Sequence, residues 1–516
     1  MPHSEFANEP FTNFADPGNK RAFEAALAEI QESFGQSHSA WIGGEEITSG
    51  PVLESRDPGN VDCLIGKYTT VDPQDAGRAI VAAHEAFETW RFVPTSERAA
   101  LFSNAADLLR ERKHLFSAMM VFEAGKSWAE ADADTAEAID FMIYYARGAM
   151  ALANPSALTP VAGEKNHLRY VPLGVGVVIP PWNFPLAIMA GMASAALVTG
   201  NTVVLKPASA SPGIASMWVE MMYEAGLPKN VLNFVPGSGG TVGEAIVNHP
   251  LTRFIAFTGS REVGLHIFDR SAQTLDGQIW MKRLIAEMGG KDGILVDSQC
   301  DLDAAVDAVV GSAFGFQGQK CSACSRAMIH QDVYDEFVTK LIPKVEALTQ
   351  GHPSDLSNYM GPVIDQAAKD KTLEYVGIGK QEGTLLVGGD VAPGNGYYVQ
   401  PTVFGDAPPD SRISREEIFG PVLTLIKVRD FDHGLEVANN TDYGLTGSVF
   451  TDNEEHKVDA INRFHVGNFY INRKCTGAFV GGHPFGGFNM SGTDSKAGGP
   501  DYLLLFTQAK TISEKV

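Results

Sequence analysis

The chain has 516 residues, of which 44% are hydrophobic and 20% charged, and its formal net charge is -22. One hydrophobic core stops growing at roughly 250 to 300 residues, so this length predicts two large domains in an ordinary globular protein. The negative charge, with no block of Lys and Arg residues, would repel a phosphate backbone and argues against a nucleic-acid-binding protein.

The first residues and the cysteines indicate a compartment. Residues 1–10 have neither the basic nor the apolar segment of a secretory signal. The five cysteines are odd in number and scattered, which argues against a disulfide framework and for a reducing, cytoplasmic environment. Prolines interrupt the uncharged run over 171–205, and the apolar helix left over 186–198 is shorter than the ~20 residues that cross a bilayer, so we expect no membrane span.

Helical patterns dominate the first part of the chain. The polar beginning predicts an arm over 1–37 with one helix near 20–34. Asp72 and Pro73 supply a capping side chain and a proline for the first helical position, and apolar residues then recur at helical spacing up to Trp90. Similar patterns predict one helix over 98–122 and another over 135–150.

A strand and helix alternation begins at residue 174. Apolar runs predict strands over 174–179, 202–205, 231–235 and 254–257, and a second series starts with a strand over 294–296 and a helix at Asp301. This alternation predicts open, mainly parallel α/β sheets, with a domain boundary near residues 287–290. The apolar run 502–506 reads as a strand that has no place in either sheet and is a candidate for pairing with another subunit.

Cys321 is the candidate nucleophile. It follows Gly315 and Gly318, which end the helix begun at Asp301, so its thiol is presented on a polar, glycine-rich loop. A cysteine is otherwise most often a small buried hydrophobe. Cys324 completes a C-x-x-C pattern, which leaves open a dithiol redox pair or half a metal site. Because no second pair or histidine cluster has zinc spacing, we expect no metal.

Two polar residues lie at predicted strand ends. Glu287 follows the apolar residues 284–286, where a partly desolvated carboxylate can act as a general base, although a lone Glu is more often a solvated strand end. Asn183 stands between prolines in PPWNFP, at the edge where open α/β sheets build their sites. Its amide can donate to an oxyanion or merely make its own turn bond.

Two glycine-rich stretches are candidates for binding phosphate. Residues 237–243 (GSGGTVG) do not keep the G-x-G-x-x-G spacing of the common dinucleotide fingerprint. Gly259 and Ser260 follow a predicted strand and open a helix at Arg261. The amino end of a helix with a hydroxyl beside it suits a pyrophosphate, so the second stretch is the better candidate.

Together these segments resemble the aldehyde dehydrogenase superfamily, from about Trp41 to the end of the chain. The shared motifs are PWNFP (181–185), KPA (206–208), FTGSREVG (257–264), EMGGK (287–291), GQKC (318–321), EEIFGPV (416–422) and PFGGFNMSG (484–492). Within the superfamily, FGFQGQKCSA and NRKCTGAFVGGHPFGG are most similar to Δ1-pyrroline-5-carboxylate dehydrogenases, also called L-glutamate-γ-semialdehyde dehydrogenases.

The resemblance implies an aldehyde dehydrogenase-like α/β fold with two open, mainly parallel domains. The implied divisions are a dinucleotide-binding domain over 38–148 and 172–286, a catalytic domain over 287–497, and oligomerisation elements, a hairpin and the tail, over 149–171 and 498–516. A homo-oligomer is therefore expected.

The resemblance also implies NAD(P)-dependent oxidation of L-glutamate γ-semialdehyde, formed from Δ1-pyrroline-5-carboxylate, to L-glutamate, the second step of proline degradation. The Cys321 thiolate would add to the aldehyde, and the Asn183 amide with the Cys321 N–H would hold the oxyanion of the thiohemiacetal. After hydride transfer to nicotinamide, Glu287 would activate the water that hydrolyses the thioester.

By resemblance, the cofactor residues follow a cleft from the adenine ribose to the nicotinamide: Lys206, Ser209, Gly259, Ser260, Trp182, Glu417 and Phe419. Lys206 would lie at the adenine ribose, Ser260 at the pyrophosphate, Glu417 on the nicotinamide ribose. Many NAD-preferring relatives carry Glu where this chain has Ser209. A Glu would repel a 2′-phosphate and Ser209 would not, so we expect NADP to be accepted beside NAD.

The aldehyde of the resemblance carries an α-carboxylate and an α-ammonium. By resemblance, Ser322 and the backbone N–H groups of Gly477 and Ala478 would bind the carboxylate, since successive N–H groups form an anion nest. Phe184 and Phe485 would pack on the methylenes, although core packing explains such aromatics equally well without the resemblance. No role is assigned to three neighbours: Arg473, Lys474 and His483.

Three alternatives remain open. Another semialdehyde dehydrogenase, for example for succinate semialdehyde, would share every catalytic motif and differ around residues 472–485. A dithiol redox enzyme would need Cys324 as well as Cys321. A non-catalytic descendant of the family would be expected to have lost Asn183, Glu287 or Cys321, and all are present.

Overall fold

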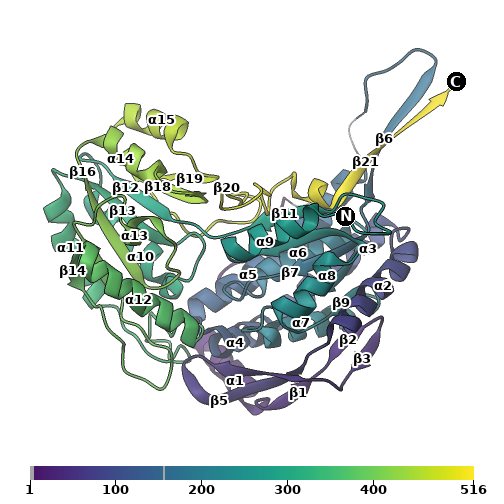
Figure 1. Cartoon of the computed structure of the whole chain (residues 1–516), viewed down its shortest axis with the longest axis horizontal. Helices are drawn as coiled ribbons and strands as arrows, with labels where there is room; N and C mark the ends of the chain where they lie inside the picture. Colours follow the sequence, from purple (N-terminus) through teal and green to yellow (C-terminus); the bar gives the residue numbers. More distant parts are fainter. Residues whose placement is uncertain (1–4, 155–156) are drawn as a thin grey trace.

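Two seven-stranded sheets divide the computed structural model into two lobes (Figure 1). It describes residues 5–154 and 157–516, so residues 1–4 of the predicted arm and residues 155–156 of the predicted oligomerisation hairpin lie outside the described residues. The chain passes from the last strand of the first sheet, β11 (Arg283–Glu287), directly into β12 (Asp292–Val296) of the second. The predicted fold class, two open α/β sheets, is confirmed.

The first sheet is parallel over five strands and antiparallel at one edge. Its order is β11, β10 (Thr252–Thr258), β7 (Val175–Ile179), β8 (Thr202–Leu205), β9 (Leu232–Phe234), β2 (Ala40–Ile42), β3 (Glu45–Ile47). The strands predicted from apolar runs are present within about two residues of the expected ends. β2 and β3 run antiparallel because the tight turn at Gly43 and Gly44 joins them directly.

Nine helices accompany this lobe in the described part of the chain: α1 (Pro17–Glu32), α2 (Pro73–Trp90), α3 (Thr95–Glu111), α4 (Lys113–Ala124), α5 (Trp128–Leu152), α6 (Ala187–Val198), α7 (Pro212–Glu224), α8 (Glu244–Asn248) and α9 (Arg261–Ala272). The expected cap of α2 is present, since the Asp72 carboxylate accepts from the Asp75 N–H. The single helix predicted over 98–122 is wrong. α3 and α4 meet at Arg112, where a φ of −105° and a ψ of 17° interrupt the helix, and α4 is buried over most of its surface whereas α3 is mostly not.

α5 begins at Trp128, well before the predicted start at residue 135. The periodicity missed its first turns because they carry acidic residues, Asp132 and Asp134 among them, that are buried rather than exposed. This polar beginning of α5 reaches the cavity described below.

The second sheet has the order β14 (Thr384–Val387), β15 (Thr402–Gly405), β16 (Val422–Val428), β13 (Cys324–His330), β12, β18 (Thr446–Phe450), β19 (Asn468–Ile471). Its helices are α10 (Leu302–Phe314), α11 (Tyr334–Glu346), α12 (Gln366–Glu382), α13 (Arg412–Arg415), α14 (Phe431–Asn439) and α15 (Glu454–Arg463). Asp301 caps α10 as expected, by accepting from the Ala304 N–H at 3.0 Å.

The tail differs from its prediction. Residues Tyr502–Phe506 form a 3-10 turn (η3) and not a strand, because this conformation turns Tyr502 and Phe506 onto the core, where their rings lie 5.2 Å from Tyr145 and 5.5 Å from Phe254. The strand comes later. β21 (Thr507–Lys515) pairs antiparallel with β6 (Glu164–Pro172) of the same chain and forms a ribbon that projects from the lobe (Figure 1).

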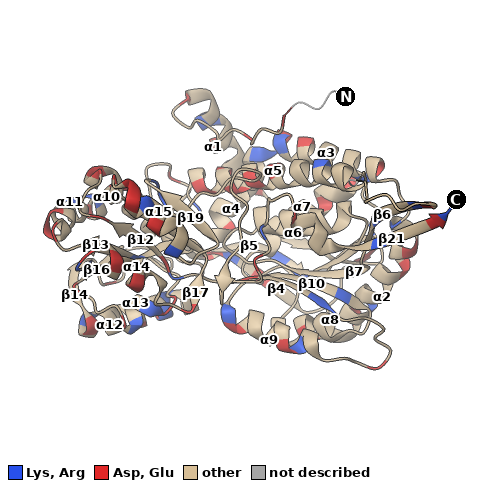
Figure 2. Cartoon of the chain, turned by 90° about the horizontal axis from the view of Figure 1, so that it is seen from above, with Lys and Arg blue, Asp and Glu red and all other residues tan. Residues whose placement is uncertain are grey.

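Two smaller sheets complete the described elements. They are β1 (Gln36–His38), β5 (Asn60–Thr69) and β4 (Val52–Asp57), and β17 (Tyr443–Gly444) with β20 (Phe488–Asn489). Acidic and basic residues alternate over the outer helices, for example α9, α12 and α13 (Figure 2). No helix among the described residues combines the length and the apolar character that crossing a membrane requires.

Strand register brings distant segments to one place. Ile179, Phe257 and Ala286 are aligned across β7, β10 and β11, so the segments that follow these strands leave the same edge of the first sheet. In the second sheet, Asp292 and Cys324 are aligned at the start of β12 and β13. The residues before those strands therefore meet the residues that leave the first sheet.

Candidate active site

Cys321 stands on a strained loop between α10 and β13. Phe316 and Gln317, in the 3-10 turn η2 (Gly315–Gly318), have left-handed φ values of 50° and 57°, which are unfavourable for residues with a side chain. The Gln317 side chain holds this conformation by donating to the carbonyls of Gly125 (3.0 Å) and Pro362 (2.7 Å). Since both carbonyls belong to other parts of the fold, the loop that presents the thiol is fixed from outside.

The Cys321 thiol is partly exposed and surrounded by carboxylates. Burial, followed by the charges of Asp292, Glu287 and Glu417, raises the pKa of the thiol above its ordinary value, while the Ser322 N–H stabilises the thiolate. A thiol is a nucleophile only as thiolate. A neighbouring base must therefore accept its proton when it attacks.

The Glu287 carboxylate is held at the end of β11 by donors from a distant segment. Oε2 accepts from the Gly487 N–H at 3.1 Å, and Oε1 accepts from the Ser495 N–H at 3.1 Å and the Ser495 hydroxyl at 2.6 Å. Burial outweighs these bonds and raises the pKa of Glu287 to about 7. A carboxylate with this pKa is suited to general-base catalysis near neutral pH.

Asn183 lies in the turn between β7 and α6, and its side chain is buried. Its Nδ2 donates to the Gln319 carbonyl at 3.0 Å, which ties the amide to the loop of Cys321. An amide has two N–H groups, and this bond uses one of them. The second N–H has no acceptor among the described hydrogen bonds, and Asn183 itself is not among the residues that line the cavity described next.

A cavity of about 470 Å³ lies between the lobes. It is lined by Cys321 and Glu287, by the residues predicted to bind the aldehyde and by parts of α5 and α6. The predicted aldehyde-binding residues on its wall are Phe184, Ser322, Gly477, Ala478 and Phe485. Segments from almost the whole length of the chain, Phe11 to Tyr502, thus converge on one cavity, as the placement of several of them after or before sheet strands favours.

The backbone at Gly477 and Ala478 is oriented by Arg473, for which no role was expected. Arg473 donates from Nη2 to the carbonyls of Thr476 and Gly477, at 2.9 Å each. Because C=O and N–H point in opposite directions across a trans peptide, these bonds direct the N–H groups of Gly477 and Ala478 to the other side. The two N–H groups therefore lie on the side away from Arg473, which is the orientation that the expected anion nest needs.

Charged residues that sequence reasoning missed also line the cavity. Lys320 pairs with Glu130 at 2.6 Å, and burial raises the pKa of Glu137 to about 8. A single Glu or Lys in one sequence does not indicate a binding site by itself. Glu130 was also missed because the predicted helix began at residue 135, whereas α5 begins at Trp128. Acidic spacing along α5 is the one hint that could have found them.

The adenine end of the predicted cofactor cleft follows β8 and β10. Lys206 is buried, its Nζ donates to the Pro207 carbonyl at 3.2 Å, and burial lowers its pKa to about 8. Ser209 is exposed. Ser260 caps α9 by accepting from the Val263 N–H at 3.3 Å. The other N–H groups of the first turn have no partner within the helix and can donate to an anion.

Gly259 joins this region to the general base. Its N–H donates to the Glu287 carbonyl at 3.1 Å, and a Cβ at this position would lie 2.5 Å from the Phe257 ring. The close packing therefore requires glycine here.

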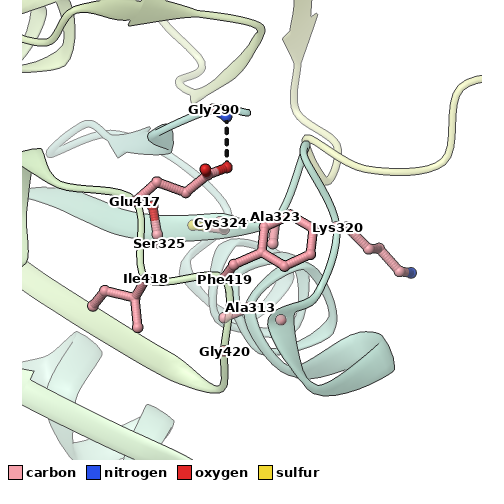
Figure 3. A pocket seen from close by; sticks show the side chains of 11 residues that line it. Gly290, Ala313, Lys320, Ala323, Cys324, Ser325, Glu417, Ile418, Phe419 and Gly420 are labelled. Atoms are coloured by element: carbon pink, nitrogen blue, oxygen red, sulfur yellow. Dashed lines mark hydrogen bonds between the residues drawn. The ribbon is translucent and has the colours of Figure 1, made fainter. Parts of the chain in front are cut away.

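The other end of the predicted cleft is built around Gly290. Glu417 accepts from the Gly290 N–H at 3.0 Å, as Figure 3 shows, and burial raises the pKa of its carboxyl. Phe419 has a left-handed φ of 62° and meets Trp182 edge to face, with ring centroids 5.5 Å apart. The structure thus brings together Glu417, Phe419 and Trp182, which come from two lobes.

Cys324, the second cysteine of the C-x-x-C pattern, is buried in the core of the second lobe. Its Sγ donates to the Arg326 carbonyl at 3.3 Å, and it is 1% exposed. Among the described residues, no group of three or more His, Cys, Asp or Glu side chains is arranged to hold a metal ion. His483 accepts from the Phe479 N–H at 3.1 Å and so supports the loop of the anion nest.

A family profile, a relative and solved structures each match nearly the whole of this chain. The profile of the Aldehyde dehydrogenase family matches residues 46–512. A 1-pyrroline-5-carboxylate dehydrogenase of Geobacillus sp. (strain WCH70) is 54% identical over 509 residues, 99% of each chain. Crystal structures of 1-pyrroline-5-carboxylate dehydrogenase from Thermus, one of a Thermus thermophilus mutant and one with bound NAD, are each 46% identical, cover 100% of both chains and have a TM-score of 0.98.

Proposed function

The chain belongs to the aldehyde dehydrogenase family, and on that premise we propose that it oxidises L-glutamate γ-semialdehyde, the open form of Δ1-pyrroline-5-carboxylate, to L-glutamate with NAD. This is the second step of proline degradation. The observation that carries the proposal is the single cavity that Cys321 and Glu287 share with the Gly477 and Ala478 nest. A nucleophile, a base and a carboxylate site at one cavity suit an aldehyde that ends in an acid.

The residues of the predicted cleft fit a dinucleotide. The ammonium of the buried Lys206 has one hydrogen-bond acceptor among the described residues, the Pro207 carbonyl. Ser260 is the N-cap of α9, and the rings of Trp182 and Phe419, which meet edge to face, offer an aromatic surface. In our proposal Lys206 and Ser260 hold the adenine ribose and the pyrophosphate, and Glu417 holds the nicotinamide ribose. Bound NAD supplies the hydride acceptor that no side chain can provide.

The first chemical step belongs to Cys321. Its thiol loses a proton to Glu287 or to a water beside it, and Sγ bonds to the aldehyde carbon, which gives a thiohemiacetal oxyanion. The free N–H of the Asn183 amide and the backbone N–H of Cys321 donate to that oxygen. Departure of the aldehydic hydrogen as hydride leaves a thioester on Sγ.

The second step belongs to Glu287. With a pKa of about 7, its carboxylate accepts a proton from water while the water oxygen bonds to the thioester carbon. The C–S bond then breaks, which releases the carboxylic acid and regenerates the Cys321 thiol. Splitting the oxidation in this way replaces hydride loss from an aldehyde hydrate with two easier steps, hydride loss from a thiohemiacetal and hydrolysis of a thioester.

Selection of the substrate rests on both its charged groups. The nest at Gly477 and Ala478, with Ser322, binds the α-carboxylate, and Phe184 and Phe485 pack on the methylenes. Glu137 lines the same cavity, and although burial raises its pKa to about 8, an α-ammonium bound beside it would favour the carboxylate form. Succinate semialdehyde has no ammonium group, so it cannot use Glu137 and is the weaker candidate.

Reduction of nicotinamide by the purified protein, measured with both cofactors against a panel of aldehydes, tests this function. Bonds to a charged group are worth ~1.5–3 kcal/mol, so kcat/KM for glutamate semialdehyde should exceed that for propanal by about tenfold or more. Equal efficiency with propanal would sink the substrate assignment but leave the dehydrogenase. Higher efficiency with succinate semialdehyde would favour the alternative.

Use of NADP follows from Ser209. An exposed Ser at this position cannot repel a 2′-phosphate, so we expect comparable catalytic efficiency with both cofactors. Ser209→Glu should lower kcat/KM for NADP and leave that for NAD within about threefold, as charge repulsion acts on the phosphate alone. A native preference for NAD of about a thousandfold, roughly 4 kcal/mol, would contradict the idea.

Assembly, location and domain division complete the proposal. The dinucleotide-binding domain (38–148 and 172–286) would bind NAD, and the catalytic domain (287–497) would carry Cys321. The elements over 149–171 and 498–516 would join the subunits of a homo-oligomer. An isolated two-stranded ribbon such as β6 with β21 is marginally stable in water, which supports its packing on another subunit. Five free cysteines support a reducing, cytoplasmic location.

A further inference from the structure

The segment before α1 crosses the outer end of the substrate cavity. We call residues 6–12 the arm segment. Phe11 and Thr12 line the cavity that also holds Cys321 and the anion nest, although they are more than 300 residues from either in the chain. The polar arm expected from the sequence is therefore part of the cavity wall.

Two buried carboxylates of α5 anchor the arm segment. Thr12 donates to Asp132 from its N–H at 2.8 Å and from its hydroxyl at 2.5 Å. Asp140 accepts from the Glu9 N–H at 2.7 Å and from the Asn8 side chain at 2.8 Å. Asp132 and Asp140 are 1% and 4% exposed. Bonds to ionised, buried acceptors are stronger than neutral ones, so the arm segment is held in one position.

Lys113 adds a third attachment. Its Nζ donates to the Pro10 carbonyl at 2.9 Å and pairs with Asp132 at 3.0 Å. The negative charge of Asp132 is thereby balanced by a cation that also binds the arm segment.

The arm segment also contacts the loop that forms the anion nest. The Asn8 side chain donates to the Val480 carbonyl at 3.0 Å. The Phe11 ring stacks on the Phe479 ring with centroids 5.9 Å apart and planes inclined by 23°. Phe479 directly follows Ala478, so the arm segment touches the loop at the residues next to the nest.

The part of this loop next to the nest depends on side chains for much of its shape. Residues 472–487 contain no helix or strand, and their backbone pairing is confined to the far part of the loop, where Phe485 forms a bridge with Ala497 and the Gly481 N–H donates to the Gly498 carbonyl. Arg473 and His483 hold the loop from within, as described above, and the arm segment holds it from the cavity side. Two independent supports thus orient the N–H groups of Gly477 and Ala478.

We propose that the arm segment is the outer wall of the aldehyde cavity and that Phe11 is a positioning residue for the substrate carboxylate, acting through Phe479 and the nest. The inference rests on the proposed binding of the carboxylate by Gly477 and Ala478. It assigns the beginning of the chain a role in choosing aldehydes that carry an acid group.

Kinetics of Phe11→Ala with glutamate semialdehyde and with propanal tests the proposal. An aromatic pair is worth ~0.5–1.5 kcal/mol, so KM for glutamate semialdehyde should rise by about threefold to tenfold. The kcat should stay within about twofold, because Phe11 touches no reacting atom, and propanal kinetics should not change, because propanal has no carboxylate.

Two further variants serve as controls. Phe11→Tyr keeps the stacked ring and should retain the native KM for glutamate semialdehyde. Phe92→Ala removes another exposed aromatic, 72% exposed against 56% for Phe11, from a position away from the cavity and should behave as the native chain. Because Phe11 is exposed, the Ala variant should fold, which the melting temperature checks.

The outcomes separate the possibilities. An unchanged KM in Phe11→Ala overturns the inference, and so does an equal loss with both aldehydes, which would mean a general structural role. Failure of the native chain to prefer glutamate semialdehyde over propanal would refute the proposed function, and with it the inference. A selective rise in KM, absent in Phe11→Tyr and Phe92→Ala, supports both.

Discussion

At the scale of residues, chemistry is assigned by environment. Cys321 and Cys324 are three positions apart and share a side chain type, yet Cys321 is partly exposed at the cavity and Cys324 is packed in the second core. Glu287 differs from surface carboxylates because burial raises its pKa to about 7. These environments predict different effects of substituting Cys321 and Cys324, and a pH dependence of kcat that is due to Glu287.

Cys321→Ala should lower kcat by about 10⁴-fold or more, since it removes the atom that bonds to the aldehyde. Cys324→Ala should leave kcat within about twofold and cost ~1 kcal/mol of unfolding free energy, through the lost packing of one buried sulfur. Steady-state kinetics and thermal melting of both variants check this. Equal loss of activity in the two would instead indicate a dithiol redox enzyme.

The pH dependence of kcat should report Glu287. A base acts when ionised, so with a pKa of about 7 the rate should be low at pH 6, rise through pH 7 and level off above about pH 8. Glu287→Gln should give one rapid burst of nicotinamide reduction per site and then turn over about 10² to 10⁴ times more slowly, because the thioester waits for water. The rise of kcat between pH 6 and pH 8 should be absent from Glu287→Gln. Full steady-state turnover in that variant would exclude Glu287 as the base.

At the scale of elements, the site is assembled from strand ends and helix beginnings. β7, β10 and β11 end in register, which places Asn183, Ser260 and Glu287 on one edge. α9 has its N-cap at Ser260 just beyond that edge, so the positive end of its dipole and its first N–H groups lie at the same edge. A helix cap can therefore serve stability and binding at once.

Ser260→Ala and Asp72→Ala separate these two uses of a cap. Both remove an N-cap acceptor, that of α9 or α2, and each should lower the free energy of unfolding by ~1 kcal/mol. Only Ser260→Ala should also raise KM for NAD, by about threefold to tenfold, because its hydroxyl would bond to the pyrophosphate. Thermal melts and NAD titrations give both numbers, and the same KM in the two variants would remove Ser260 from the cofactor site.

At the scale of the whole molecule, the ribbon of β6 and β21 lies outside both lobes (Figure 1). Such a ribbon exposes both faces unless another surface covers one of them. The cavity between the lobes and the ribbon are built from different elements, so we expect a substitution on the ribbon to change assembly without changing the catalytic residues.

Ile512→Asp should weaken assembly, because it puts a charge on β21 where the ribbon would pack on a second subunit. Light scattering should then show a shift toward the 55.4 kDa monomer. Leu356→Asp, at a residue that is 38% exposed in a loop of the second lobe, should keep the native mass. A native mass in both variants would mean that the ribbon is not the assembly surface.

Patterns among neighbouring residues predict most of the local elements and the residue types of the site. Apolar runs located the strands of the first sheet, Asp72 and Asp301 marked helix starts, and short motifs supplied Asn183, Glu287 and Cys321. These features depend on neighbours in the chain, through capping bonds and side-chain periodicity, and are therefore visible without a structure.

The contacts that these residues make depend on the folded chain. Ser495 binds Glu287 across 208 positions, Arg473 orients the nest, and Phe11 joins the cavity wall from the start of the chain. The break at Arg112 and the turn at Tyr502–Phe506 likewise follow from packing against distant elements. Such contacts are chosen by burial and strand register over the whole fold, and no local pattern records them.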